Sequence, residues 1–244
     1  MCAALWGGAS NAWAGVALSV PPDIPLNITV GTTIASTLRI THQNDGTEAG
    51  QNDVIDPGTI TLVPSCGANP VGPNCPAGSE DPGVLVPSAT GTGVSGTACD
   101  GITFTFTLTN AAMGKYTLTW PGTITLTPTG ATQSCIISFT TDVKKMPTKD
   151  ANAVTAGLQT SQASGANATA QGPGNLPGSG TGSDQATVLQ GAIAIQTQVS
   201  PTPIVLGAAF HDTATITKPA VGPTPTGTVK FDVYGPGDAS CAGT

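Results

Sequence analysis

Cysteine is the residue type in this chain with the clearest capacity for chemistry. Cys66 and Cys75 bound a Pro- and Gly-rich loop, whereas Cys99 and Cys135 flank the most regular stretches of alternating residues. No CxxC pair occurs among the six cysteines, and neither of the two histidines lies close to a cysteine in sequence. Zinc ligation is therefore disfavoured. Disulfides formed in an oxidising compartment are the favoured interpretation.

The favoured pairing joins Cys66 to Cys75 and Cys99 to Cys135. Cys135 lies on the inward-facing parity of its expected strand, as a buried bridge would require. Four cysteines allow two further pairings, and the sequence does not choose among the three. Cys2 belongs to an expected leader, so Cys241 remains as an odd cysteine that we expect to pair outside these residues.

Carboxylates gather in residues 42–56, HQNDGTEAGQNDVID, which form the most polar stretch of the chain. Oxygen atoms are the ligands that Ca²⁺ prefers. The candidate calcium ligands are Asp45, Glu48, Asp53 and Asp56. Their spacing is not that of an EF-hand loop, and Asn-Asp-Gly and Asp-Pro-Gly are ordinary turn sequences. A solvated loop is therefore favoured over a metal site.

Catalytic patterns are weak in this sequence. His42 and His211 are expected at the surface ends of strands, and no GxSxG nucleophile motif occurs. Glu80 and Asp81 could in principle serve a glycosidase, but they are adjacent in a Ser/Pro/Gly loop and are expected to be solvated. We therefore expect that the chain is not an enzyme and needs no cofactor.

Alternating strands are the elements expected to position these residues. In residues 102–109, ITFTFTLT, four apolar side chains point one way and four threonines point the other. Residues 115–120 and 135–143 repeat the alternation, with turn signals between them. A period of two with one polar face is typical of an antiparallel strand half-buried in a sandwich. The predicted fold class is therefore all-β, an Ig-like antiparallel β-sandwich.

Composition and charge narrow both the expected secondary structure and the expected kinds of partner. Gly (32) and Pro (21) are abundant and recurring Thr favours strands, so almost no helix is expected. A net charge of −7 would repel nucleic acid. Nothing in the sequence approaches the ~18 continuous apolar residues of a membrane span. Neither a nucleic-acid partner nor a transmembrane segment is expected.

Changes in composition divide the chain into four expected parts. Residues 1–14 end in an A-x-A cleavage pattern and are interpreted as a partial signal peptide. Residues 19–149 are expected to form the disulfide-bonded β-sandwich domain, and residues 150–187 a flexible Gly/Ser/Ala-rich linker. Residues 188–244 alternate again, with a last strand expected over 228–234, and are interpreted as an incomplete second Ig-like module.

This second module resembles the bacterial Ig-like repeats of secreted and cell-surface proteins. The matching residues are Val199-Ser200-Pro201, Asp212 to Thr215, Pro225 to Val229 leading into Phe231, and Tyr234 to Asp238 with Cys241. The first domain is only weakly similar to modules that precede such repeats, on ACDGITFTFTLTNAAMGK, CIISFTTDVKKMP and GLQTSQ. The resemblance implies an extracellular repeat protein with a non-catalytic spacer, display or adhesive role at the cell surface.

Two kinds of partner follow from these expectations. The open sheet edge of the incomplete module is expected to pair with a strand of another chain. The alternative function is a carbohydrate- or calcium-dependent binding module carried by the first domain, with cell-wall or environmental glycans or proteins as ligands. The exposed row of Thr103, Thr105, Thr107 and Thr109 is a candidate polysaccharide surface. Good strand propensity with a soluble face is the favoured explanation of that row.

Overall fold

The structure is a computed structural model, and it describes residues 17–19, 22–43, 52–67, 75, 77–149, 156–171, 177–191, 193–200, 203, 207–218 and 224–232. The expected signal peptide, residues 1–14, lies outside these ranges, as do Cys2 and Cys241. Within them the chain is all-β, and the only helical element is the 3-10 turn Ala131–Gln133. The predicted all-β class is confirmed.

The strands follow one another closely along the chain. The first four are β1 (Ala17–Ser19), β2 (Pro22–Asp23), β3 (Asn27–Thr29) and β4 (Thr33–Gln43). The next eight are β5 (Asn52–Ile55), β6 (Ile60–Cys66), β7 (Leu85–Pro87), β8 (Thr90–Gly93), β9 (Thr103–Asn110), β10 (Lys115–Thr119), β11 (Ile124–Leu126) and β12 (Ser134–Val143). The last four are β13 (Ala156–Gln171), β14 (Pro177–Leu189), β15 (Ala194–Ser200) and β16 (His211–Thr217).

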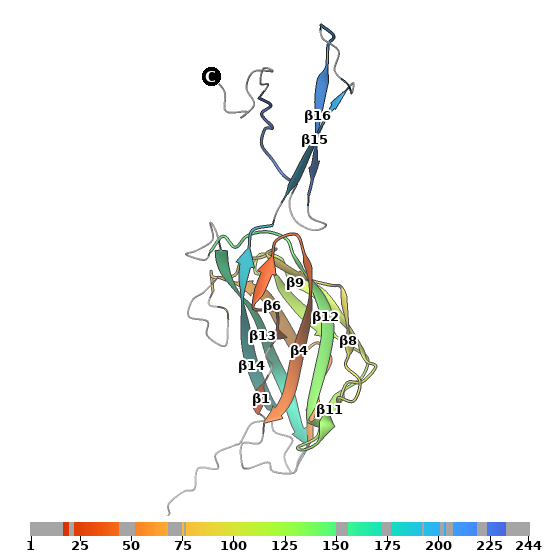
Figure 1. Ribbon diagram of the computed structural model, residues 1–244. Coiled ribbons are helices and arrows are strands. Elements are labelled where there is room, and N and C mark those ends of the chain that lie inside the picture. The colour runs from red at the N-terminus through yellow and green to blue at the C-terminus, as the bar shows by residue number, and fades with distance from the viewer. Residues whose placement is uncertain are drawn as a thin grey trace, which may run out of the picture.

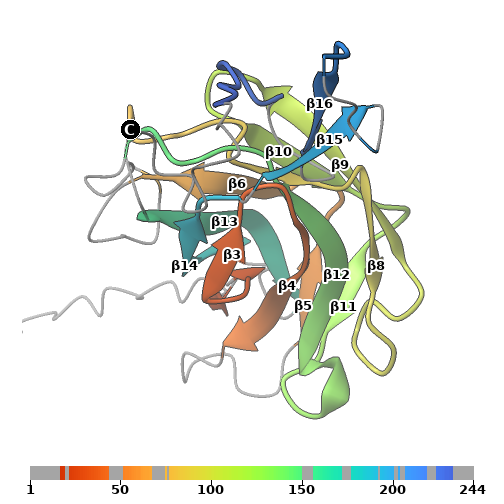
Figure 2. The ribbon, with the colours of Figure 1, turned by 45° about the horizontal axis from the view of Figure 1, so that its top comes forward.

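Strands β1 to β14 form a flattened sandwich whose two layers are joined at their edges (Figures 1 and 2). The ladder runs from β6 through β10, β9, β8, β12, β4 and β1 to β14. It then closes, because β13 pairs with both β14 and β6. Most pairs are antiparallel, but β14 runs parallel to β1 and β3.

The core follows the alternation seen in the sequence. Phe104 and Phe106 of β9, Leu118 of β10, and Ile137 and Phe139 of β12 all point into one buried cluster. The alternation fails where a strand leaves this cluster. Leu108 shares the parity of the two phenylalanines but lies near the end of β9, where it is exposed.

The structure corrects the interpretation of residues 150–187 as a flexible linker. β13 and β14 pair with each other, and both are built into the sandwich, β13 beside β5 and β6 and β14 beside β1 and β3. The sequence signal is weak there because small residues carry no apolar alternation. Backbone N–H and C=O groups form ladder hydrogen bonds whatever the side chain. The sandwich therefore extends from Ala17 to Leu189.

Two contacts near the end of β14 fasten it to the rest of the sandwich. Ala186 and Val188 are buried in a second apolar cluster that includes Ile28 and Val143. The Asp184 carboxylate accepts a hydrogen bond of 2.9 Å from the Ile24 backbone N–H. These contacts lie at the C-terminal end of the segment, beyond its Gly-rich part.

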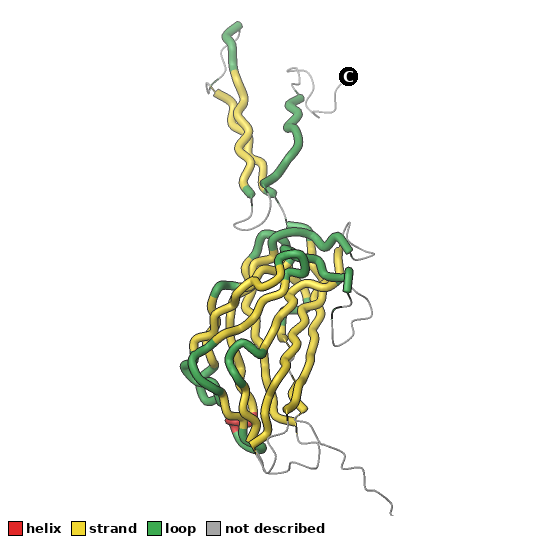
Figure 3. Tube along the Cα trace, turned by 180° about the vertical axis from the view of Figure 1, so that it is seen from behind, coloured by secondary structure: helices red, strands yellow, loops and turns green. Residues whose placement is uncertain are grey.

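Strands β15 and β16 form a separate two-stranded antiparallel sheet. Figure 1 shows this hairpin beyond one end of the sandwich, and Figure 3 shows the same arrangement from behind. The strand expected over residues 228–234 is not formed in its described part, because residues 224–232 join no ladder. An extended segment becomes a strand only beside a partner, and the described residues supply none.

Candidate functional site

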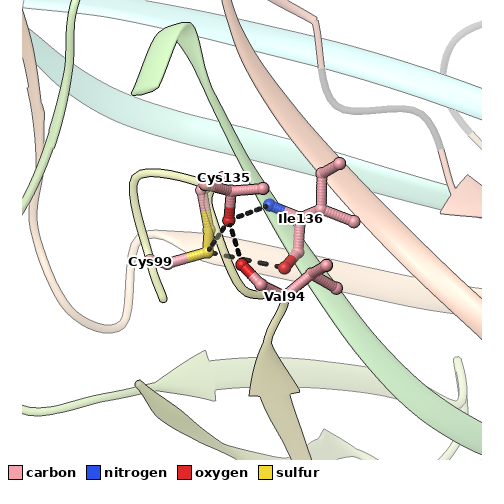
Figure 4. Close-up of a disulfide and its surroundings, with 5 residues drawn as sticks. Val94, Cys99, Cys135 and Ile136 are labelled. Carbon is pink, nitrogen blue, oxygen red and sulfur yellow. Dashed lines mark hydrogen bonds between the residues drawn. A yellow bond between two sulfur atoms is a disulfide. The ribbon is translucent and has the colours of Figure 1, made fainter. Parts of the chain in front are cut away.

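Both disulfides of the favoured pairing are present. Cys66 is bonded to Cys75, with a Cα–Cα distance of 5.7 Å, and Cys99 to Cys135, with 5.1 Å. Figure 4 shows the second bridge, with Val94 and Ile136 beside it. The Val94 N–H donates a 2.7 Å hydrogen bond to the Ile136 carbonyl. The bridge therefore holds the loop between β8 and β9 against β12. Its role is structural, since both sulfur atoms belong to the apolar core.

A buried histidine–aspartate pair joins β4 to β5, and it corrects the expectation that His42 lies on the surface. The His42 side chain is 2 % exposed and Asp53 is fully buried. His42 Nδ1 lies 2.5 Å from Asp53 Oδ2. The signal that sequence reasoning missed is parity, because residue 42 shares the inward face of Leu38 and Ile40. His211 is exposed at the start of β16, as expected.

The candidate calcium ligands are not brought together by the described residues. Asp53 is buried against His42, whereas Asp56 is exposed just beyond β5. Asp45 and Glu48 lie outside the described residues. No group of three or more His, Cys, Asp or Glu that could hold a metal ion occurs in the described ranges. Asp53 thus serves the interior of the sandwich.

Asp81 is buried, which corrects the expectation that Glu80 and Asp81 are solvated. The Asp81 carboxylate accepts hydrogen bonds from the backbone N–H groups of Thr148 and Lys149 at 2.6 and 3.2 Å. It also accepts one from the Thr148 hydroxyl at 3.0 Å. Glu80 is buried as well and accepts the Gly78 N–H at 2.7 Å. These carboxylates therefore hold segments of backbone in place, including the one that follows β12.

The threonine row lies exposed on the outer face of β9, as its parity predicts. Cross-strand pairing extends it into short rows of hydroxyl-bearing residues over β10, β8 and β12. The rows are Thr119–Thr105–Thr90 and Thr103–Thr92–Ser138. Among the described residues, the hydroxyls of Thr103, Thr105 and Thr107 form no hydrogen bond to protein. The face is uncharged at these positions.

The hairpin carries an apolar face that the described residues leave open. Ile195 lies opposite Ile216, and the two side chains are 51 % and 45 % exposed. Phe231, in the segment after the hairpin, is also exposed. The opposite face carries Gln196 and Thr215, which help to line a hollow of about 230 Å³. The hairpin thus has one face that carries the two exposed isoleucines and one polar face.

Asp142 of β12 forms two polar contacts at the surface of the sandwich. Lys144 Nζ lies 2.8 Å from the Asp142 carboxylate, which also accepts a hydrogen bond from the Thr33 hydroxyl. The hydrogen bond from Lys144 lowers the pKa of the Asp142 carboxyl below its usual value, and the hydrogen bond from Thr33 lowers it further by a smaller amount. Burial raises the pKa of the Tyr116 phenol.

The described ranges contain no helix with the length and apolar character that a membrane span requires.

No protein-family model and no curated protein matches the chain. One similar solved structure is the cohesin module from Clostridium perfringens ATCC13124 family 33 glycoside hydrolase. It is 9% identical, with a TM-score of 0.37, and the alignment covers 71% of this chain and 98% of that one. A likeness of this size carries no inference about function.

Proposed function

We propose that the chain is a non-catalytic structural and adhesive protein of the cell exterior, in which β-sandwich modules act as spacer or display units. The resemblance of residues 188–244 to bacterial Ig-like repeats belongs to this proposal. Two disulfides within one sandwich support an oxidising compartment. Their placement supports a rigid unit. The Cys99–Cys135 bridge joins the loop between β8 and β9 to β12, and the Cys66–Cys75 bridge joins the last residue of β6 to Cys75.

The observation that carries the proposal is the burial of three side chains that could act as a general acid or base. A general acid or base must reach a substrate proton. His42, Asp53 and Asp81 are instead enclosed by the sandwich, where each holds another part of the fold. These polar groups therefore contribute to the stability of the fold, as expected of a rigid spacer.

Adhesion is assigned to the hairpin, through strand pairing with another chain. Its apolar face and strand edges are the features by which sheets recruit further strands. Ile195 and Ile216 lie opposite each other and are both about half exposed, so they are the apolar side chains that we assign to this contact. The sandwich then serves as the base that presents the hairpin.

The test measures retention of bead-bound full-length chain on bacterial cell-wall preparations under flow. We expect wild-type beads to be retained and beads carrying Ile195→Lys with Ile216→Lys to wash off. The matched control is Leu26→Lys, because Leu26 is 72 % exposed but lies on the sandwich. Equal retention of the hairpin variant and wild type would refute the adhesive role. An unchanged melting transition would show that the sandwich of the variant is folded.

A second candidate function is carbohydrate binding by the sandwich, and the threonine rows are the observation that favours it. Hydroxyls that form no bond to protein are available to bond the hydroxyls of a sugar. The adjacent methyl groups are suited to apolar contact with the sugar ring. No carboxylate cluster supports calcium dependence within the described ranges. Because the threonine rows carry no charge, the ligand that we propose for this face is a neutral polysaccharide.

A further inference from the structure

The outer edge of β16 is open within the described part of the chain. β16 pairs with β15 alone, and residues 224–232 add no strand beside it. A two-stranded hairpin is marginally stable in water, whereas three or more strands with an apolar face are stable. Strand addition at this edge would therefore stabilise the hairpin as well as join two molecules.

We propose that β16 pairs antiparallel with β16 of a second copy of this chain, about a twofold axis at Thr215. The proposal rests on the strand-pairing role proposed above and names the partner. In this register Thr215 lies opposite Thr215 of the second copy, and Ala214 lies opposite Ile216. A register centred on one residue is self-complementary, so the interface is isologous and closes at a dimer.

The faces of the hairpin agree with this register. Ile216 and Ala214 lie opposite Ile195 and Thr197 of β15, so these four side chains share one face. The twofold pairing places Ile216 of one copy beside Ala214 of the other. A four-stranded sheet results, with rows that run Ile195, Ile216, Ala214, Thr197 from one copy to the next. The open apolar face thereby becomes continuous across both molecules.

Charge complementarity selects this register over its neighbours. Centring on Thr215 puts Asp212 of each copy opposite Lys218 of the other, and opposite charges in such pairs are stabilising. Centring on Ala214 would instead put Ile216 opposite Asp212, and centring on Ile216 would put Lys218 opposite Ala214. Asp212 Oδ1 is buried and has no hydrogen-bond partner among the described residues. A cation from a second copy would compensate this carboxylate.

A disulfide test reads the register directly. Thr215→Cys is placed in the full-length chain with Cys2→Ser and Cys241→Ser, so that the other two cysteines outside the observed bridges are removed. Residues directly opposite in an antiparallel pair are close enough for a disulfide. We expect mild oxidation at low protein concentration to convert most of this variant to a covalent dimer.

The matched control is Thr197→Cys in the same background. Thr197 is the middle residue of β15, so it would lie on the twofold axis if β15 of one copy paired with β15 of the other. Thr197 is exposed, like Thr215. We expect at least tenfold slower crosslinking for this variant. Faster crosslinking at residue 197 would mean that the other edge pairs, and no crosslinking at residue 215 would mean that β16 does not meet its own copy. Either result overturns the proposal.

A charge-exchange series gives a second readout by sedimentation equilibrium. Asp212→Lys and Lys218→Asp should each weaken the dimer by about tenfold, because like charges replace opposite ones at two symmetric positions. The double variant should recover to within about threefold of wild type. A double variant no tighter than the single ones would overturn the register. A monomeric wild type whose hairpin still mediates retention on cell walls would overturn the second-copy assignment alone and leave the adhesive role in place.

Discussion

His42 Nδ1 lies 2.5 Å from Asp53 Oδ2 in the interior of the sandwich. Removing one member of a buried pair leaves the other member in the interior without that contact. We therefore expect His42→Leu to lower the free energy of unfolding by about 3 kcal/mol, measured by urea denaturation. Asp53→Asn keeps an acceptor for the imidazole N–H and should cost only about 1 kcal/mol.

The double variant His42→Leu with Asp53→Leu is the control for this pair. Because it removes both polar groups, it should be destabilised by less than the sum of the two single leucine variants. Additive costs would show that the two side chains are independent, contrary to the contact seen in the structure.

The two disulfides should differ in their contribution to stability. The Cys99–Cys135 bridge spans a sequence separation of 36, against 9 for Cys66–Cys75. In the chain-entropy model the longer loop stabilises by about 4 kcal/mol and the shorter by about 3 kcal/mol. We expect replacement of both Cys99 and Cys135 by serine to lower the urea midpoint of unfolding more than replacement of both Cys66 and Cys75 by serine. The reverse order would indicate that the loop between β8 and β9 is held by its other contacts.

Asp142 predicts a dependence of stability on pH. Its folded pKa lies below the unfolded value, so its contribution is present above the unfolded pKa and is lost as pH falls through the folded pKa. Since an unfolded aspartate titrates near pH ~3.9, the advantage of wild type over Asp142→Asn should hold at neutral pH and vanish in acid. Solvent screening limits it to about 0.5 kcal/mol.

Urea denaturation of both proteins at neutral pH and near pH ~3 measures this difference. Lys144→Gln removes the larger cause of the lowered pKa and should shrink it. A constant gap between wild type and Asp142→Asn across that range would contradict the assignment.

The threonine face predicts a loss of polysaccharide binding. If the sandwich binds neutral glycans, Thr103→Ala, Thr105→Ala and Thr107→Ala together should weaken binding on a glycan array by at least tenfold, because three free hydroxyls are removed. Thr123→Ala with Thr125→Ala, at exposed positions in and beside β11, is the control and should bind like wild type. Absence of any wild-type binding would remove the second candidate function.

The strongest sequence patterns predicted the strands of the apolar core. Residues 102–109 and 135–143 became β9 and β12, because aromatic and branched residues alternate there with polar ones. β13 and β14 could not be predicted in this way. Their small residues enter the sandwich through backbone pairing, and the partner strands lie far away in the sequence.

The buried polar groups show a different limit of sequence reasoning. The inward parity of His42 could be read from Leu38 and Ile40, but the pairing with Asp53 depends on how β4 and β5 meet. Asp81 offers no such periodic signal. It is buried because Thr148 and Lys149, from the segment after β12, wrap around it.

The parallel pairing of β14 with β1 and β3 has a mechanical consequence. Tension between Ala17 and Leu189 pulls the start of β1 and the end of β14 in opposite directions along neighbouring strands. The hydrogen bonds between the strands are then loaded together in shear, whereas a hairpin pulled at its open end breaks them one after another. The sandwich is thus oriented to resist stretching along the chain.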